Sequence, residues 1–489
     1  EGGSRAFMAA YNSWNGIPMS IHPCLEEITR KQWGNNGIIC TDGGALKLLI
    51  EAHKSFPSFA EGAAAVVKAT TGQFLDAYVP YVKEALEKGL LTEVDIDKAI
   101  RGNIFVALKL GLLDGDNSRN PYLSIGKNST ETPPFMTAEA RRLAREVTAK
   151  SVVLLKNKNL LPLDAGKLRK IAIIGPYSDK IVQDWYSGTP PYETTILSGI
   201  RNAVKEGTEI IHAEDNRMGQ AEKAAAAADV AIVCVGNHPY GTRADWKFSP
   251  VPSDGREAVD RKSLMLPDED LVKLVLKANP NTILVLVSSF PYTINWSQEH
   301  VPAIVHITHC SQEQGNGLAD VLFGKVNPAG RTVQTWVKDI TDLPDMMDYD
   351  IRNGRTYMYH QGPVLYPFGY GLSYSDFAYE KIESVKQDKK NIRVTVSVKN
   401  TSGRDGEEVV QLYASYPDSK VERPSKQLRA FKRIPIKAGE SREVTLTVPK
   451  EELGYWNEEK QMFVVEPGTV KLLIGASSED IRLEGKVKL

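Results

Sequence analysis

The spacing of apolar residues changes along the chain and divides it into regions of different structure. Up to about residue 114, short apolar runs such as 37–40 alternate with helical patterns, which predict an Ala-rich helix over 59–68 and a long amphipathic helical stretch over 81–110. Alternating strands and helices are the pattern of parallel β/α units. A closed barrel of eight such units needs about 250 residues. We therefore expect this region to form only part of a barrel.

A second alternating region follows a polar segment that is rich in Gly, Asn, Ser and Pro. Its apolar runs are nearly continuous, which is typical of strands covered on both faces. They predict an open, mostly parallel α/β sandwich with helices that include 219–228 and 269–278. The predicted strands are 170–174, 209–213, 230–235, 282–287 and 303–308.

From about residue 377 the apolar residues recur at every second position, as in Ile392, Val394, Val396 and Val398. This period, with Gly, Asn and Pro between the runs, indicates a β-sandwich. The chain is therefore expected to be a multidomain α/β plus all-β protein. The predicted domains are 1–115 (the C-terminal part of a TIM-type (β/α)8 barrel), 116–148 (a linker), 149–345 (the open α/β sandwich), 346–376 (a connecting segment) and 377–489 (the β-sandwich).

Charge and composition narrow the classes of function. Among 489 residues there are 60 Lys and Arg against 61 Asp and Glu, a formal net charge of -1. This balance argues against a chain drawn as a whole onto nucleic acid or anionic lipid. No apolar run approaches the ~20 residues of a membrane span. The four cysteines form no C-x-x-C pair and no zinc-like spacing, and the first residues show no signal-peptide pattern.

Asp42 is the first candidate for chemistry. It stands directly after the predicted strand 38–41, and the carboxyl ends of barrel strands carry catalytic groups. Gly43 and Gly44 allow a sharp turn with space beside the carboxylate. An ordinary turn or a helix cap has the same composition, so this pattern alone leaves both interpretations open.

The polar segment 237–267 holds the second candidate. It is far longer than the usual connection in α/β folds, and it leaves the carboxyl end of the predicted strand 230–235, where open sheets place their sites. Trp246 offers a flat face for stacking on a sugar ring, and Glu257 is a candidate acid. The alternative is a solvated loop in which Glu257 pairs with a neighbouring arginine.

Other chemistries find little support. Ile174-Gly175-Pro176 lacks the G-x-G-x-x-G pattern, and Pro176 removes a backbone donor where a phosphate would need one, so we reject nucleotide binding. The histidines show no H-E-x-x-H or other metal-ligand spacing, and no G-x-S-x-G elbow is present. We predict no metal and no cofactor.

Short motifs along nearly the whole chain resemble, in their order and spacing, glycoside hydrolase family 3, the β-glucosidase and β-xylosidase family. The resemblance implies that the C-terminal β-sandwich is fibronectin type III-like. The matching segments are 7–12, 15–18, 33–42, 146–163, 255–261, 354–357, 366–374, 410–413, 423–424 and 438–440.

The same resemblance implies roles for single residues. Asp42 matches the family's nucleophile, and Glu257, three positions before an Asp-Arg pair, matches its acid/base. Tyr11, Met8 and Trp246 are expected at the substrate. Tyr11 is expected either as a hydrogen-bond donor to Asp42 or the sugar, or as a packed barrel residue.

Two features depart from the family pattern. Gly43 stands where family members carry an aromatic residue or cysteine, most often Trp in the glucosidases, so another residue such as Trp246 is expected to supply the stacking wall. The resemblance also begins near the sixth barrel strand, so about five strands of the barrel and the sugar-binding residues that they carry are not matched. We expect a companion segment to complete the barrel.

The expected activity is that of a retaining exo-β-glycosidase, with β-glucosidase as the main interpretation and an oligosaccharide or aryl β-glycoside as substrate. Retention needs two carboxyl groups about 5–5.5 Å apart, so Asp42 and Glu257 are expected to face each other across one sugar at the boundary of barrel and sandwich. The alternatives are a β-xylosidase or α-arabinofuranosidase, favoured by 343–357, and a non-catalytic carbohydrate-binding scaffold. A homodimer is left open, no nucleic acid or membrane partner is expected, and a periplasmic or secreted location is favoured over the cytoplasm.

Overall fold

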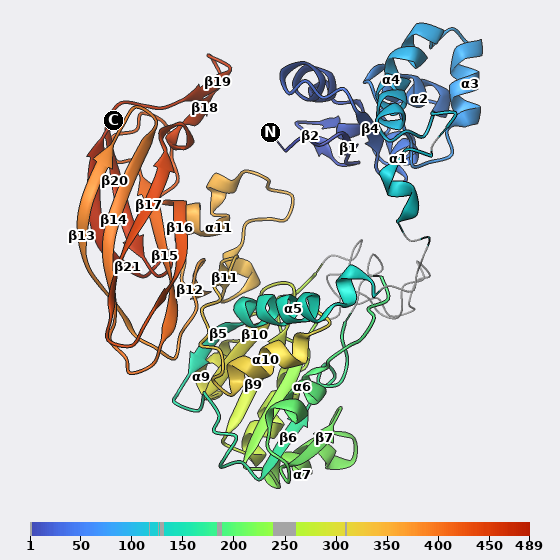
Figure 1. Ribbon diagram of the computed structural model, residues 1–489. Helices are drawn as coiled ribbons and strands as arrows, with labels where there is room; N and C mark the ends of the chain where they lie inside the picture. Colours follow the sequence, from blue (N-terminus) through green and yellow to red (C-terminus); the bar gives the residue numbers. More distant parts are fainter. Residues whose placement is uncertain are drawn as a thin grey trace. The chain divides into compact units, whose positions relative to one another are not determined.

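The computed structural model describes residues 2–116, 118–125, 127, 132–182, 188–237, 261–308 and 311–489 (Figure 1). The chain divides into two compact units, residues 1–131 and residues 132–489.

The first unit contains a parallel strand pair, β1 (Ala6–Ala9) and β4 (Ile38–Thr41), in which Met8 lies opposite Cys40. A short hairpin of β2 (Ser13–Trp14) and β3 (Ile17–Pro18) follows β1. The helices of this unit are a π-helix at Leu25–Gln32, α1 (Ala45–Glu51), α2 (Phe59–Lys68), α3 (Val79–Glu87) and α4 (Glu93–Lys109).

The sequence pattern predicts α2 to the residue, but the expected helical stretch over 81–110 is two helices. Gly89 takes a left-handed φ of 70° just after α3, which ends a helix without a Cβ penalty. Thr92 and Asp95 then form a capping box that starts α4. Local capping therefore breaks a continuous apolar pattern.

One face of the β1–β4 pair is packed and the other is open. Ala9 and Ile39 are buried, and buried residues of α1, α2 and α4 form the neighbouring core of this unit. Met8 and Cys40 share the opposite face because their positions are paired, and the Met8 side chain is 58% exposed. The segment 72–75 contributes one further bridge, between Cys40 and Gln73. The barrel itself remains a prediction.

The second unit begins with α5 (Ala138–Ser151) and a six-stranded sheet in the order β5-β10-β9-β8-β6-β7. The strand β5 is antiparallel to β10, and the other neighbours are parallel. The prediction of a mostly parallel sheet is confirmed, although the antiparallel edge strand β5 was not predicted. The strands are β5 (Val153–Asn157), β6 (Lys170–Ile174), β7 (Glu209–Ala213), β8 (Val230–Gly236), β9 (Thr282–Val287) and β10 (Ala303–Ile307).

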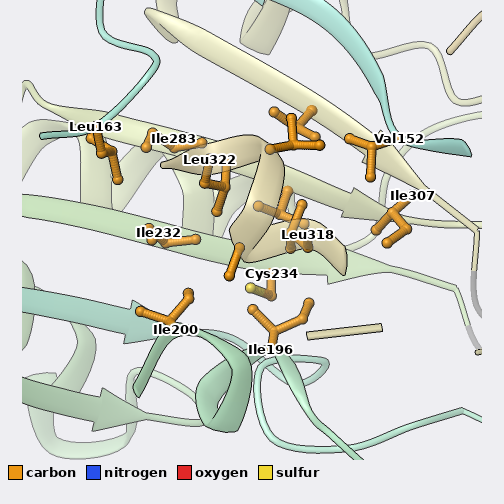
Figure 2. Packing of buried hydrophobic residues seen from close by; sticks show 14 of the residues in the cluster. Val152, Leu163, Ile196, Ile200, Ile232, Cys234, Ile283, Ile307, Leu318 and Leu322 are labelled. Carbon is orange, nitrogen blue, oxygen red and sulfur yellow. The ribbon is translucent and has the colours of Figure 1, made fainter. Parts of the chain in front are cut away.

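Helices cover both faces of this sheet, which explains its continuous apolar runs. Residues of α5, α6 and α10 pack on one face, where Ile232 and Cys234 meet Ile196 and Leu318 (Figure 2). Residues of α7 and α8 pack on the other face, next to residues that flank α9. The remaining helices are α6 (Ile196–Ala203), α7 (Gln220–Ala226), α8 (Glu269–Ala278), α9 (Asn295–His300) and α10 (Gln314–Leu322).

The C-terminal residues form two facing antiparallel sheets, β13-β14-β17 and β16-β15-β20-β21. The alternating residues Ile392, Val394, Val396 and Val398 are all buried in the core between them, so the predicted β-sandwich is confirmed. The strands are β13 (Phe377–Gln387), β14 (Asn391–Asn400), β15 (Gly406–Ser415), β16 (Gln427–Ile436), β17 (Ser441–Pro449), β20 (Thr469–Gly475) and β21 (Ile481–Lys488), with a small hairpin of β18 (Tyr455–Asn457) and β19 (Met462–Val464).

Buried polar contacts join the two sandwiches. Arg331 and Glu408 form an ion pair of 2.9 Å with little exposure on either side, and the Tyr379 hydroxyl donates to Glu408 at 2.8 Å. Removing one partner of such a pair would leave a buried charge without compensation. The connecting chain holds β11 (Trp336–Val337), α11 (Thr356–Tyr359) and β12 (Val364–Tyr366). No helix in the described part of the chain has the length and apolarity needed to cross a bilayer.

Candidate active site

Asp42 lies at the carboxyl end of β4, as the sequence predicts. Its backbone N–H donates to the carbonyl oxygen of Ala9, at the end of β1, at 3.0 Å. Its side chain is half-buried, and Oδ1 accepts a hydrogen bond of 2.7 Å from the N–H of Gly43. The neighbouring strand and the turn therefore both fix the carboxylate.

The charge of Asp42 acts on its neighbour in β4. The pKa of the Cys40 thiol is raised above its ordinary value, chiefly by burial and in part by the negative charge of Asp42. Both effects favour the neutral thiol. Cys40 is thus a weak candidate for a nucleophile, and the carboxylate is the stronger one at this strand end.

Asp76 organises the loop that follows Asp42, and sequence reasoning missed it. Its Oδ1 accepts from the N–H of Gly44 at 2.6 Å, and its Oδ2 accepts from the N–H of Leu46 at 2.8 Å. Gly44 precedes α1 at a left-handed φ of 75° and has no side chain with which to cap the helix. Asp76 therefore supplies the missing cap from elsewhere in the chain.

The segment that carries Asp76 is clamped to β4 by further hydrogen bonds. The N–H of Thr41 donates to the carbonyl of Gln73 at 2.9 Å, and the N–H of Leu75 donates to Oγ1 of Thr41 at 3.0 Å. The available signal in the sequence was the position of Asp76 just after the apolar pair 74–75.

Tyr11 and Met8 belong to the strand beside Asp42. Tyr11 follows β1 with 38% of its surface exposed, and its carbonyl oxygen lies 2.8 Å from Nε2 of His53. The other ring nitrogen of His53 lies 3.3 Å from the Ser13 hydroxyl. Because parallel strands end at one edge, the structure brings Met8, Tyr11 and Asp42 to the same end of the β1–β4 pair. His53, which ties the loop after β1 to the end of α1, was not predicted.

The surroundings of Gly43 are open. A Cβ placed on Gly43 meets no atom within 4 Å, and its φ lies outside the left-handed region. The backbone therefore leaves room for a Cβ where the family resemblance leads one to expect an aromatic residue.

Glu257 and Trp246 lie outside the described residues, between Asn237 and Arg261. Asn237 follows β8, is almost fully buried, and accepts from the N–H of Ser289 at 3.1 Å. Arg261 lies over the ring of Phe290, 4.0 Å from its centroid. Both ends of the segment are thus fixed to residues just after β9, at the carboxyl edge of the sheet where the sequence places the second candidate.

Other candidates for chemistry in the described ranges are weak. Cys234 is fully buried, which raises the pKa of its thiol. Within these ranges no cluster of three or more His, Cys, Asp or Glu side chains offers a metal site.

Three family models match the chain. The glycosyl hydrolase family 3 N-terminal domain matches residues 1–102, the glycosyl hydrolase family 3 C-terminal domain matches residues 152–374, and a fibronectin type III-like domain matches residues 408–478. The matches follow the order of the regions inferred from the sequence pattern.

Comparisons that cover nearly all of this chain agree with these models. The chain is 30% identical to a periplasmic β-glucosidase of Salmonella typhimurium, over 99% of this chain and 67% of that protein. It is 29% identical to a β-xylosidase of Formosa agariphila, over 98% of this chain and 68% of that protein. Its structure is similar to that of a β-glucosidase of Erythrobacter marinus, with a TM-score of 0.84, 26% identity, and coverage of 100% of this chain and 68% of the other. The chain thus spans about two thirds of the length of these relatives.

Proposed function

The chain belongs to glycoside hydrolase family 3 and is a glycoside hydrolase, and we propose that it is a retaining exo-acting β-glucosidase. It releases a terminal non-reducing sugar from an oligosaccharide or aryl β-glycoside through a covalent glycosyl-enzyme. The names of the relatives support β-glucosidase as the main interpretation. A β-xylosidase is the second candidate, because a relative of similar identity carries that name.

Asp42 is the proposed nucleophile, and the observation that carries this assignment is its fixed position at the end of β4. The hydrogen bond from Gly43 occupies Oδ1, so we assign attack on the anomeric carbon to Oδ2. The bond formed is a glycosyl ester, and the bond broken is the glycosidic C–O bond. Anchoring of the backbone to Ala9 keeps the carboxylate in place during attack.

Glu257 is the proposed acid/base, on the strength of its sequence motif alone. In the first step it gives its proton to the leaving oxygen as the glycosidic bond breaks. In the second step it takes a proton from the water that attacks the ester, which frees the sugar and restores the carboxylate of Asp42.

Three further residues complete the proposed site. Tyr11 and Met8, at the end of β1, are proposed to contact the sugar, and Trp246 is proposed to stack on the sugar or the aglycone. Exposure of Tyr11 and Met8 supports this role, since a packed residue would not reach a ligand.

The finer points of organisation are also proposals. We propose that residues 1–115 contribute to a (β/α)8 barrel, supported by the parallel pair β1–β4 and its flanking helices, and we retain the other domain boundaries given above. A periplasmic or secreted location is proposed from the name of one relative. The companion segment and the homodimer stay predictions.

Asp42→Ala in the full-length protein tests the assignment on a panel of nitrophenyl β-glycosides, which also separates glucosidase from xylosidase. Turnover should fall by roughly 10⁴-fold or more, because a group that forms the covalent bond has no substitute. Circular dichroism should be unchanged. Asp97→Ala, an exposed aspartate on α4, is the control and should keep full activity. Normal turnover of Asp42→Ala would remove Asp42 from the mechanism.

A further inference from the structure

A cavity of about 410 Å³ lies between the α/β sandwich and the β-sandwich of the second unit. Phe290 and Trp336 line it from the α/β sandwich and the chain that leaves it, and Val409 and Phe431 line it from the β-sandwich. The volume is within the range of pockets that bind small ligands, roughly 300–1,000 Å³. The cavity therefore has room for a small ligand.

The lining of this cavity is mostly apolar, and part of it is open to solvent. Phe431 on β16 is 66% exposed, and Val333 is 81% exposed. Phe290 and Trp336 add two further aromatic rings. Single exposed apolar side chains are common, but several around one concave site are typical of a binding surface. A ligand that enters from solvent can therefore contact Phe431 and Val333 directly.

The charged and titratable groups of the lining favour a neutral ligand. Lys150, Arg331 and Arg433 each have a side-chain nitrogen within 2.9 Å of a glutamate oxygen, so their charges are already balanced. Burial lowers the pKa of His306 to about 4, so its imidazole is neutral near pH 7. The lining thus matches a neutral ligand, and its three aromatic rings favour one that is flat and aromatic.

The position of the cavity connects it with the proposed reaction. Ser289 and Phe290 follow β9, at the carboxyl edge of the sheet. The N–H of Ser289 donates to Asn237, and Arg261 lies over the ring of Phe290, so these two lining residues hold both ends of the segment that carries Glu257. Glu257 precedes Arg261 by four residues, a stretch of at most about 14 Å. The proposed acid is therefore tethered close to the cavity.

We propose that this cavity holds the leaving group of the substrate and that it favours a neutral, aromatic leaving group. This assignment rests on the proposed function, because Glu257 gives its proton to the leaving oxygen and the leaving group must lie on its side of the bond. Phe431 then sets the preference among leaving groups, although it belongs to the β-sandwich and takes no part in bond cleavage.

A naphthyl β-glucoside and a methyl β-glucoside test the proposal in the full-length protein. In Phe431→Ala, kcat/KM for the naphthyl glucoside should fall roughly 3–10-fold, the effect of losing one aromatic contact. The value for the methyl glucoside should stay unchanged, because a methyl group is too small to fill the cavity. Val333→Asp places a charge in the apolar lining and should also lower the value for the naphthyl glucoside alone. Both residues are exposed, so the Tm should equal that of the parent protein.

Phe463→Ala is the matched control, since Phe463 is 67% exposed on β19 of the same β-sandwich and does not line this cavity. Its kinetics should equal those of the parent protein. The proposal is overturned if Phe431→Ala and Val333→Asp keep the parent's ratio of kcat/KM for the two glucosides, whether both values are unchanged or both fall equally.

Titration with naphthol separates this proposal from the proposed function. Naphthol should bind the parent protein and should bind Phe431→Ala more weakly by the same factor, since this measurement needs no turnover. A parent protein that hydrolyses no β-glycoside would overturn the proposed function. Equal binding of naphthol by the parent protein and by Phe431→Ala would instead show that the cavity does not take an aromatic ligand.

Discussion

The two strand ends that carry the proposed catalytic residues are built in different ways. The strand β8 has seven residues, all buried, and pairs with β6 on one side and β9 on the other. The strand β4 has four residues, pairs with β1 on one side, and meets the other neighbour at a single bridge to Gln73. Apolar burial therefore fixes the end of β8, whereas a few polar contacts fix the end of β4.

This difference determines which substitutions should affect each strand end. Burial energy along β8 is spread over many side chains, each worth about 1.5–3 kcal/mol, so the position of its end depends on no single residue. The orientation of Asp42 depends instead on individual hydrogen bonds: its N–H donates to Ala9, and its Oδ1 accepts from Gly43. The turn after it is held by Asp76, which accepts from the N–H of Gly44. Substitution of a polar residue near β4 should thus alter catalysis, and substitution in the sheet of β8 should alter stability.

After the loss expected for Asp42→Ala, the largest expected effect is that of Glu257→Ala, on the segment that follows β8. Loss of the general acid should lower kcat/KM by about 10²–10⁴-fold for glycosides with poor leaving groups. Aryl glycosides with good leaving groups should lose far less, since their oxygen needs little protonation. Steady-state kinetics across a leaving-group series measures this slope.

Glu299→Ala, an exposed glutamate on α9, is the control for that series and should leave the slope unchanged. An equal loss of activity on all leaving groups in Glu257→Ala would contradict the acid role.

The next effect concerns pH and the sheet of β8. His306 on β10 is buried against Trp336, with Nε2 3.0 Å from the carbonyl of Ser288, and burial lowers its pKa from 6.5 to about 4. Below pH 6.5 the imidazole of His306 binds a proton in the unfolded chain but not in the folded chain. The contribution of His306 to the free energy of unfolding is therefore fully present above pH 6.5. It falls between pH 6.5 and 4 and does not change further below pH 4. The free energy of unfolding that is lost across this window is about 3 kcal/mol.

Urea unfolding at several pH values measures this loss, and His306→Gln, which keeps a donor for the Ser288 carbonyl, should remove it. His300→Gln, an exposed histidine on α9, should behave as the parent protein. If His306→Gln still loses stability steeply between pH 6.5 and 4, the loss is caused by groups other than His306.

The same contrast explains which elements the sequence predicts. The strands at 170–174 and 282–287 match the expectation to the residue, because burial on both faces leaves a continuous apolar run. The edge strand at 209–213 also matches, although only Ala213 in it is buried. The edge strand β5 was missed, since it follows α5 directly with no turn residue to mark its start. Helix α1 was missed because seven residues are too few for a clear period.

Residues of the candidate site could be predicted only where neighbouring residues in the sequence mark them. Asp42 is marked by the strand before it and the glycines after it, and its proposed role comes from the family resemblance. Asp76 and His53 act through contacts with backbone atoms 30 to 42 residues away. A side chain that meets a distant backbone group leaves no periodic signal, so only the structure reveals it.

Asp76→Asn tests whether a polar contact governs the nucleophile. The amide keeps the size of the carboxylate but loses its charge and turns an N–H group toward Gly44 or Leu46. Loss of a hydrogen bond to a charged acceptor costs about 1.5–3 kcal/mol, so kcat should fall roughly 10–150-fold while KM stays near its parent value. Asp76→Glu should recover part of the activity. Asp97→Asn, the control, should lose none. A variant that loses stability but keeps kcat would assign Asp76 a purely structural role.

The smallest effect is expected at Gly43, where the chain departs from the family pattern. A Cβ at this residue meets open space, so we expect Gly43→Trp to be accommodated with its ring beside the proposed nucleophile, where it can stack on an aryl aglycone. Such stacking is worth about 0.5–1.5 kcal/mol, which lowers KM for nitrophenyl β-glucoside roughly 2–10-fold with little change in kcat. Gly43→Ala, the control for backbone effects, should leave KM unchanged. A fall in kcat without a decrease in KM would mean that a bulky side chain at this turn disturbs the polar contacts around Asp42. The end of β4 would then depend on these contacts even more closely than the comparison with β8 suggests.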